Sequence, residues 1–288
     1  MKKQLKFVGV TFTAAALVAC GDDEQSQTEA GAFSPDDPVT VKIGVSGTDT
    51  PQWDYIAELA EEEGIEIDLI RFSDYVQPNI ALAEEEIDAN AFQTVSYFDN
   101  FKEEHGFDHL EAIAATVLAP LGLYSDEYER VEDIPEGAEI AIANEVTNQA
   151  RNLMLLEEAG LLELEDDFGV TSGLDDIKEN PLNLTLTPVQ PANAPRIMAD
   201  IDAAIINNGI AVDAGLSPPD DAIAIEDETA TPYINIIAAR EDNADDPALQ
   251  KIIDIYQSEE VEQFILDEYE GASIPTFISV EELLNYPK

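Results

Sequence analysis

The spacing of hydrophobic and polar residues changes several times along the chain, between the alternation of a strand and the period of a helix. Residues 39–45 alternate between aliphatic and polar or small side chains, which predicts a β-strand with two different faces. From Pro51 onward, apolar residues recur at helical spacing, which predicts an amphipathic helix that ends near Gly64. Residues 65–69 alternate again, and a further short helix begins at Pro78. Strand–helix–strand units of this length predict an α/β sheet with helices on its faces.

A second series of such units follows. Residues 138–143 form a short apolar run, and Thr147 and Asn148 are suitable caps for a helix that ends near Gly160. Further strands are expected at 182–186, 203–206 and 233–238, and further helices at Pro247 and around Val261. A chain of 288 residues is long enough for two medium domains. The pattern therefore predicts a second α/β lobe at residues 125–221.

The first twenty residues have the pattern of an export signal. A basic head, residues 1–6, precedes an uncharged apolar run, residues 7–18, which is shorter than the roughly 20 residues that span a bilayer. Small residues and Cys20 follow, so residues 1–19 are predicted to be a signal peptide. The end of this segment resembles a bacterial lipobox, in which the cysteine becomes the first mature residue and carries the lipid. The alternative is an ordinary signal peptide beside a chance cysteine. Cys20 is the only cysteine, which excludes an intrachain disulfide.

Residues 20–38 are predicted to be a lipidated tether. They are rich in Asp, Glu, Gln, Ser, Thr and Pro and contain almost nothing that a core could bury. No candidate membrane span remains after cleavage. The protein is therefore expected at the extracytoplasmic face of the cell membrane, where the lipid anchors it without a membrane-spanning segment.

The chain is strongly acidic. Its 62 acidic and 13 basic side chains give a formal net charge of −49. Phosphate binding needs a basic patch, so nucleic acid is a poor partner. The acids are spread from Asp22 to Glu282, which is typical of a solvated acidic surface. Such a surface suits a medium of high salt, where the Debye length shrinks to about 3 Å at 1 M.

No catalytic or metal-binding motif stands out. The two histidines, His105 and His109, would share a face of a helix, but Gly106 lies between them and no third ligand accompanies them. Carboxylate pairs are uninformative in a chain this acidic, and the sequence contains neither a nucleophile elbow nor a phosphate-binding loop. The sequence therefore gives no support to an enzyme, a cofactor or a metal site.

Arginine is scarce, and the position of one arginine is informative. Arg151 falls in the first turns of the helix that follows the strand at residues 138–143. In α/β folds, ligands bind beyond the carboxyl ends of the strands. A guanidinium there could bind a carboxylate through two hydrogen bonds, and its place at a cleft predicts that its removal leaves the fold intact. A surface ion pair with one of the many acids is the alternative.

Several separated blocks of sequence resemble the methionine-binding lipoprotein family of ABC importers. In chain order they are residues 72–79 (FSDYVQPN), 87–93 (IDANAFQ), 144–151 (NEVTNQAR), 153–156 (LMLL), 160–162 (GLL), 205–207 (IIN), 231–235 (TPYIN) and 240–243 (REDN). The resemblance extends over residues 39–271 in the right order, and the lipobox belongs to the same pattern.

The resemblance implies a two-lobed, type II-like periplasmic-binding-protein fold with the ligand between the lobes. Residues 39–124 and 222–288 would form the first lobe and residues 125–221 the second. The protein would deliver an amino acid, with methionine as the expected ligand, to an ABC permease and its ATPase, and it would be no enzyme and need no cofactor. The ligand-binding residues implied by motif position are Tyr75, Phe92, Tyr97, Asn148, Arg151, Asn207 and Asn235.

These residue types suit an amino acid. Arg151 can bind the α-carboxylate, and the amide oxygens of Asn207 and Asn235 can accept hydrogen bonds from the α-ammonium group. Aromatic rings can pack against a thioether.

The sequence departs from the family near the expected pocket. Thr94 and Ser96 stand where the family usually has histidine and often proline, and Asn208-Gly209 replaces a common Gly-Asn order. The stretch from residue 196 to residue 207 is also slightly short. A relative tuned to another amino acid or to a short dipeptide, and a surface lipoprotein without a transport role, therefore stay open as alternatives.

If Cys20 carries the lipid, Cys20→Ser should release the protein from the membrane. The thiol of Cys20 is the attachment point of the lipid. Fractionation of cells followed by immunoblotting checks this, with release into the medium or periplasm as the expected result. A variant that stays in the membrane fraction would contradict the lipid anchor.

The acidic surface predicts that thermal stability rises with salt. Like charges repel one another in the compact state, and salt screens this repulsion. Thermal melts recorded from low to molar sodium chloride should show a rising midpoint. A flat or falling midpoint would rule out adaptation to salt.

Overall fold

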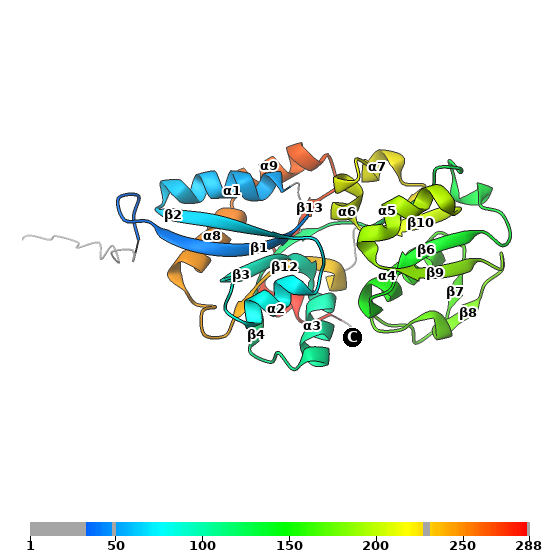
Figure 1. The fold of residues 1–288 in the computed structure, drawn as a ribbon, viewed down its shortest axis with the longest axis horizontal. Coiled ribbons are helices and arrows are strands. Elements are labelled where there is room, and N and C mark those ends of the chain that lie inside the picture. The colour runs from blue at the N-terminus through cyan, green and yellow to red at the C-terminus, as the bar shows by residue number, and fades with distance from the viewer. Residues whose placement is uncertain (1–32, 48–49, 227–230, 287–288) are drawn as a thin grey trace, which may run out of the picture. The chain divides into compact units, whose positions relative to one another are not determined.

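Two β-sheets organise the chain, and each is packed between helices on both of its faces (Figure 1). The computed structural model describes residues 33–47, 50–226 and 231–286. The predicted signal peptide, Cys20 and most of the predicted tether lie outside the described residues. The α/β class that the sequence predicts is confirmed.

The first sheet has six strands and is mixed, with both parallel and antiparallel pairs. In spatial order the strands are β13 (Ile274–Pro275), β4 (Leu110–Leu118), β12 (Ile234–Arg240), β3 (Ala89–Thr94), β1 (Val39–Ser46) and β2 (Ile65–Phe72). Strand β1 pairs in parallel with β2 and β3, whereas β12 runs antiparallel to β3 and β4. The late strand β12 is thus inserted between strands from the first half of the chain.

Helices cover both faces of the first sheet. They are α1 (Pro51–Glu62), α2 (Gln77–Ala83), α3 (Val95–His105), α8 (Pro247–Tyr256), α9 (Glu259–Tyr269) and α10 (Val280–Leu283). Trp53 of α1 and Tyr256 of α8 are buried against β1 on one face, with ring centroids 5.3 Å apart. Leu82 of α2 and Phe98 of α3 belong to the core on the other face. The apolar stripe of each amphipathic helix therefore lies against the sheet, as its spacing predicts.

The second sheet has five strands. In spatial order they are β11 (Ala224–Ile225), β5 (Gly122–Tyr124), β10 (Ala203–Ile206), β6 (Glu139–Ala143) and β9 (Thr185–Val189). Strand β6 is parallel to β9 and β10, and β5 is antiparallel to β10. A separate two-stranded ribbon consists of β7 (Glu163–Leu164) and β8 (Ile177–Glu179).

Helix α4 (Val146–Glu158) covers one face of the second sheet, where Leu153 and Leu156 are fully buried. The shorter helices α5 (Ala194–Ile197) and α6 (Asn208–Asp213) contribute Ala194 and Ala211 to the core on the other face. The remaining helical segments are α7 (Pro218–Asp221) and the 3-10 turns η1 (Val131–Asp133), η2 (Leu174–Asp176), η3 (Pro191–Asn193), η4 (Met198–Asp200) and η5 (Thr231–Tyr233).

The chain passes between the two sheets after β4 and again after β11. Strands β5 and β11 belong to the second sheet because both pair with strands of that sheet. Lobe boundaries at residues 124/125 and 221/222 would assign these strands to the first lobe. The crossings at residues 119–121 and after residue 225 are the more natural limits of the two lobes.

Several predicted elements are displaced, and some were not predicted. The strand expected at residues 182–186 is β9, which begins at Thr185 because a turn precedes it. Helix α4 begins at Val146, with Glu145 at the N-cap, so Thr147 and Asn148 are buried in its first turn instead of capping it. His105 ends α3 at Gly106, so His109 lies beyond the helix and the two histidines do not share a helical face. The described residues contain no cluster of three or more potential metal ligands.

Three buried amides fix strand β3 to helix α2. Asn79, Asn90 and Gln93 are almost fully buried, at 0%, 0% and 3% exposure. The Asn79 amide donates to Gln93 Oε1 at 2.6 Å, and Gln93 and Asn90 donate to Asn79 Oδ1 at 2.7 and 2.9 Å. Because buried amides are costly when unpaired, this network specifies how β3 and α2 pack. All three residues belong to the sequence blocks that resemble the importer family.

The end of the predicted tether packs against the first sheet. Phe33 contacts the core beneath α1, and the backbone of Ser34 pairs with that of Asp37. Gly64, the stop of α1, has φ +85, and a Cβ there would lie 2.2 Å from the Ser34 carbonyl carbon. Glycine is therefore required both for the left-handed turn and for the close passage of this segment.

No helix within the described ranges is long and apolar enough to cross a bilayer.

The close passage at Gly64 can be tested with a matched pair of glycines. Gly160 also has positive φ, at +76, but a Cβ there would meet no atom within 4 Å. Gly160→Ala should therefore cost only the backbone strain, about 1–2 kcal/mol of unfolding free energy. Gly64→Ala should cost clearly more, because the Ser34 backbone must also move. Urea denaturation of both variants measures this, and equal losses would show that the segment around Ser34 is not fixed there.

Candidate functional site

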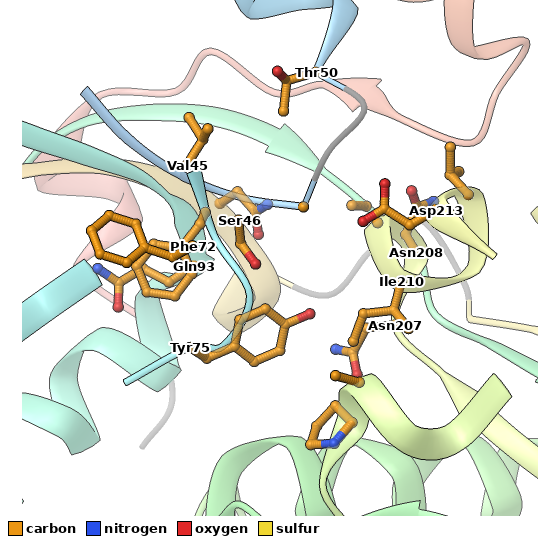
Figure 2. A pocket seen from close by; sticks show the side chains of 18 of the residues that line it. Val45, Ser46, Thr50, Phe72, Tyr75, Gln93, Asn207, Asn208, Ile210 and Asp213 are labelled. Atoms are coloured by element: carbon orange, nitrogen blue, oxygen red, sulfur yellow. The ribbon is translucent and has the colours of Figure 1, made fainter. Parts of the chain in front are cut away.

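A cleft of about 780 Å³ lies between the two sheets within the described part of the chain. Strands, loops and helix ends of both sheets line it. Tyr75, which follows β2, and Asn207, which follows β10, face each other across it (Figure 2). Asp213 of α6 and Ser46 of β1 lie near its upper part in this view. The cleft is thus at the carboxyl ends of parallel strands, where α/β folds commonly bind ligands.

All seven residues that the sequence predicts as ligand-binding line this one cleft. The first sheet and its loops contribute Tyr75, Phe92, Tyr97 and Asn235. The second sheet and its helices contribute Asn148, Arg151 and Asn207. Residues from six separate elements or loops therefore converge on this cleft.

Three aromatic rings form the wall on the side of the first sheet. The ring centroids of Tyr75, Phe92 and Tyr97 are 5.9 to 6.3 Å apart, with Tyr75 stacked on Phe92 and Tyr97 edge-on to both. The Tyr97 hydroxyl donates to the Tyr75 carbonyl oxygen at 3.0 Å. Burial raises the pKa of both tyrosines, so both stay neutral. The result is a preformed, uncharged surface suited to an apolar side chain.

Thr94 and Ser96 begin helix α3 beneath this wall. Thr94 is the N-cap residue, and its Oγ1 accepts from the Tyr97 backbone N–H at 3.3 Å. The two hydroxyl oxygens lie 3.3 Å apart, and Ser96 is only 2% exposed. Thr94 lines the cleft, whereas Ser96 supports it from behind. Thr94 therefore places a small capping hydroxyl where the family usually has the imidazole ring of a histidine.

Arg151 forms a buried ion pair with Glu226. The two side chains are 4% and 9% exposed. Arg151 Nε donates to Glu226 Oε1 at 2.8 Å, and Nη2 donates both to Glu226 Oε2 and to the carbonyl oxygen of Ala119, the latter at 3.0 Å. The guanidinium carbon lies 4.6 Å above the ring centroid of Tyr233. The alternative of a surface ion pair is therefore wrong, because the pair is desolvated and held on several sides.

This arrangement leaves one edge of the guanidinium available. Nε and Nη2 are occupied, and Nη1 has no hydrogen-bond partner in the described part of the chain. Arg151 lines the cleft, so Nη1 is the group that can meet a ligand there. Burial and pairing also change the expected effect of mutation. Removal of Arg151 leaves Glu226 as an unpaired buried charge, which is destabilising, so an intact fold is no longer expected.

Amide side chains also line the cleft. The Asn207 amide donates to Asn148 Oδ1 at 3.2 Å, which joins the loop after β10 to the first turn of α4. Asn235 lines the opposite side of the cleft from β12. Asn208 donates to the carbonyl oxygens of Pro120 and Ala272, so the start of α6 is tied to segments next to the first sheet.

Glu145 lines the cleft one turn before Asn148. Its Oε2 atom is buried without a hydrogen-bond partner among the described residues. Burial raises the pKa of this carboxyl to about 7, although its own backbone amide and the Asn148 side chain favour the ionised form. Glu145 therefore titrates in the neutral range.

The cleft differs from the rest of the molecule in its charge balance. The whole chain has 62 acidic and 13 basic side chains. In the cleft, the three acids Asp74, Glu145 and Asp213 are matched by three arginines, which are Arg71, Arg151 and Arg196. Three of the five arginines of the chain therefore line this single feature.

Sequence reasoning missed Glu145 and Glu226. The chain has 62 acidic side chains, so the sequence alone does not distinguish these two carboxylates from the others. Glu226 lies 75 residues from its partner along the chain, so only the fold reveals the pair. Glu145 does stand inside the NEVTNQAR block, three and six residues before Asn148 and Arg151, and this helical spacing was an available signal.

Known proteins resemble this chain along most of its length. A family model for NlpA lipoprotein matches residues 41–277. A probable D-methionine-binding lipoprotein MetQ of Pasteurella multocida is 36% identical over 266 residues, which are 91% of this chain and 94% of that protein. These matches agree with the resemblance found in the sequence blocks.

Solved structures show the same architecture. A nutrient-binding protein from Burkholderia cenocepacia, bound to methionine, has 36% identity and a TM-score of 0.79, covering 82% of this chain and 100% of that one. A periplasmic substrate-binding protein of an ABC transporter from Coxiella burnetii has 34% identity and a TM-score of 0.78, covering 82% and 100%. The predicted periplasmic-binding-protein fold is therefore confirmed, and the chain belongs to the NlpA lipoprotein family.

Proposed function

We propose that this protein binds an amino acid, with methionine as the preferred ligand, and delivers it to an ABC permease and its ATPase. The observation that carries the proposal is the buried guanidinium of Arg151, which is held by Glu226 and lines a cleft between two sheets. A ligand carboxylate in such a cleft loses its water, so its partner must be charged and well oriented. Arg151 has both properties.

The remaining lining groups suit the rest of an amino acid. The carbonyl oxygens of Asn207 and Asn235 can accept from an ammonium group, and the aromatic wall can pack a thioether side chain. The balanced charge of the cleft fits a zwitterion. A ligand without net charge also approaches a chain of charge −49 without the repulsion that an anion would meet. The methionine-bound and ABC-transporter relatives support the same assignment.

We also propose that the protein is fixed to the outer face of the cell membrane through a lipid on Cys20. The lipoprotein family and the lipobox-like Leu17–Cys20 segment support this. Binding proteins of importers act outside the cytoplasm, and a lipid keeps the carrier near the permease. No catalytic role is proposed, because the relatives compared above are named for substrate binding and the cleft is explained as a binding site.

A different amino acid or a short dipeptide is the second candidate ligand. Thr94 and Ser96 favour it, because small hydroxyls occupy positions where the family usually has histidine and often proline. A smaller side chain at Thr94 leaves more room beside Phe92 and Tyr97. Native mass spectrometry of freshly purified protein identifies the ligand directly, since tight binders retain it during purification.

The role of Arg151 predicts a loss of affinity when its charge is removed. Arg151→Ala should weaken binding of L-methionine by about 2–5 kcal/mol, the range for truncating one member of a buried charged pair. Arg151→Lys should recover only part of this loss, because an ammonium group cannot reproduce the planar fork. Isothermal titration calorimetry of the full-length chain in detergent measures these affinities. Methioninamide, which lacks the carboxylate, should bind wild type poorly and should discriminate little between wild type and variant.

Two further variants separate binding from folding. Arg151→Gln combined with Glu226→Gln removes both buried charges together, so it avoids leaving Glu226 unpaired while still removing the carboxylate partner. Arg130→Ala breaks only an exposed ion pair with Asp133 and serves as the matched arginine control. Wild type that binds acid and amide equally, or a folded double variant with wild-type affinity, would contradict the role of Arg151.

A further inference from the structure

Helix α4 presents a row of three side chains to the cleft. Glu145 at the N-cap, Asn148 and Arg151 are spaced by three residues, and side chains at this spacing lie along one face of a helix. All three line the cleft. The row therefore places a carboxyl, an amide and a guanidinium in sequence along one wall.

Helix capping does not explain the burial of one oxygen of the Glu145 carboxyl. An acid at an N-cap usually accepts a hydrogen bond from the first turn, but the Glu145 side chain makes no such capping bond. Its Oε2 atom is buried with no hydrogen-bond partner in the described residues. A buried, unpaired carboxylate oxygen costs free energy, and a ligand that donates hydrogen bonds to it would remove this cost.

We propose that Glu145 is the counter-ion of the α-ammonium group of the bound amino acid. The inference rests on the proposed function and deepens it, since it assigns a charge to the second pole of the ligand. Asn207 and Asn235 were already proposed to accept hydrogen bonds from the ammonium group. Glu145 would add the negative charge that neutralises it.

The row offers charges of opposite sign to the two poles of a zwitterion. Six residues of α-helix advance about 9 Å, so the backbone positions of Glu145 and Arg151 are separated by roughly that distance. Both side chains are long enough to lean toward a ligand between them, beside Asn148. An α-amino acid held between the two side chains would present its ammonium group to Glu145 and its carboxylate to Arg151, in a cleft that the aromatic wall also lines.

The neighbours of Glu145 make its charge responsive to a ligand. The charged groups that share the cleft are Asp74, Asp213, Arg71, Arg151 and Arg196. Tyr75 and Tyr97 also interact with Glu145, and both stay neutral. Arg151 is paired with Glu226. A ligand ammonium placed beside Glu145 would favour its ionised form and would lower its pKa from about 7.

This shift links binding to proton release. Burial favours the protonated form of Glu145 in the free protein, and an ammonium group beside it favours the ionised form. Binding of an amino acid near neutral pH should therefore release protons. Affinity should rise as pH increases through about 7 and should fall below it, because protonation of Glu145 in the free protein competes with the ligand.

The test combines a protein variant with a ligand variant. L-Methionine and methylsulfanylbutanoate, the analogue that lacks the α-amine, are titrated into the full-length protein in detergent. Glu145→Gln should weaken methionine binding about 10- to 100-fold, as expected for a hydrogen bond between charged groups, but should leave the analogue within about threefold. Glu129→Gln, which removes one exposed carboxylate of the same type, is the control and should change neither affinity.

Proton release gives a second measurement that a merely structural role would not alter. Titrations of methionine in two buffers of different ionisation enthalpy report the number of protons exchanged. Wild type and Glu129→Gln should release protons on binding near neutral pH, and Glu145→Gln should release none. Equal loss of affinity for both ligands, or proton release unchanged in Glu145→Gln, would overturn the assignment.

Failure of the proposed function gives a different result. Wild type that does not bind methionine but binds another α-amino acid in a thermal-shift panel refutes the methionine assignment alone, and the same paired titrations then use that amino acid and its desamino analogue. If no α-amino acid in the panel raises the melting temperature of the wild-type protein, both the proposed function and the role of Glu145 are overturned.

Discussion

A buried charge needs a partner, and this constraint shapes the centre of the molecule. The burial of Arg151 depends on Glu226, because the transfer of an unpaired ion from water into the protein interior has a large cost in free energy. Glu226 directly follows β11, which is an edge strand of the second sheet. Packing of α4, the course of the chain after β11 and the position of Tyr233 over the guanidinium all have to agree before the pair can form. The wall of the cleft is therefore a product of the whole fold.

The distribution of charge separates two physical requirements. The chain as a whole has 62 acidic and 13 basic side chains, a composition that suits a protein dispersed in a screening medium. The cleft gathers three of the five arginines, so locally the large negative charge is offset. Selection on the surface and on the cleft can thus act independently. A strongly acidic exterior is compatible with a site whose chemistry depends on an arginine.

Much of the fold could be predicted from periodicity. The strands at residues 39–46 and 203–206 and the helix from Pro51 lie where alternation and helical spacing place them. Helix α3 was missed although Thr94 and Gly106 cap it, and strand β4 was missed because its residues do not alternate. The cleft residues came from motif resemblance, and they do converge. The sequence did not predict which buried polar side chains bond to each other, such as Arg151 with Glu226 or Asn79 with Gln93. Tertiary packing determines these pairs.

The groups that hold Arg151 also determine what happens when the two sheets move. Ala119 and Glu226 belong to the two segments in which the chain passes from one sheet to the other. In any rotation that pivots on these segments, points near the axis move least. Arg151 would then stay almost stationary while Tyr75 and Phe92, on the opposite wall, travel the greater distance. A carboxylate could rest on the guanidinium throughout such a motion, and closure would consist of the aromatic rings arriving over a ligand already held at one end.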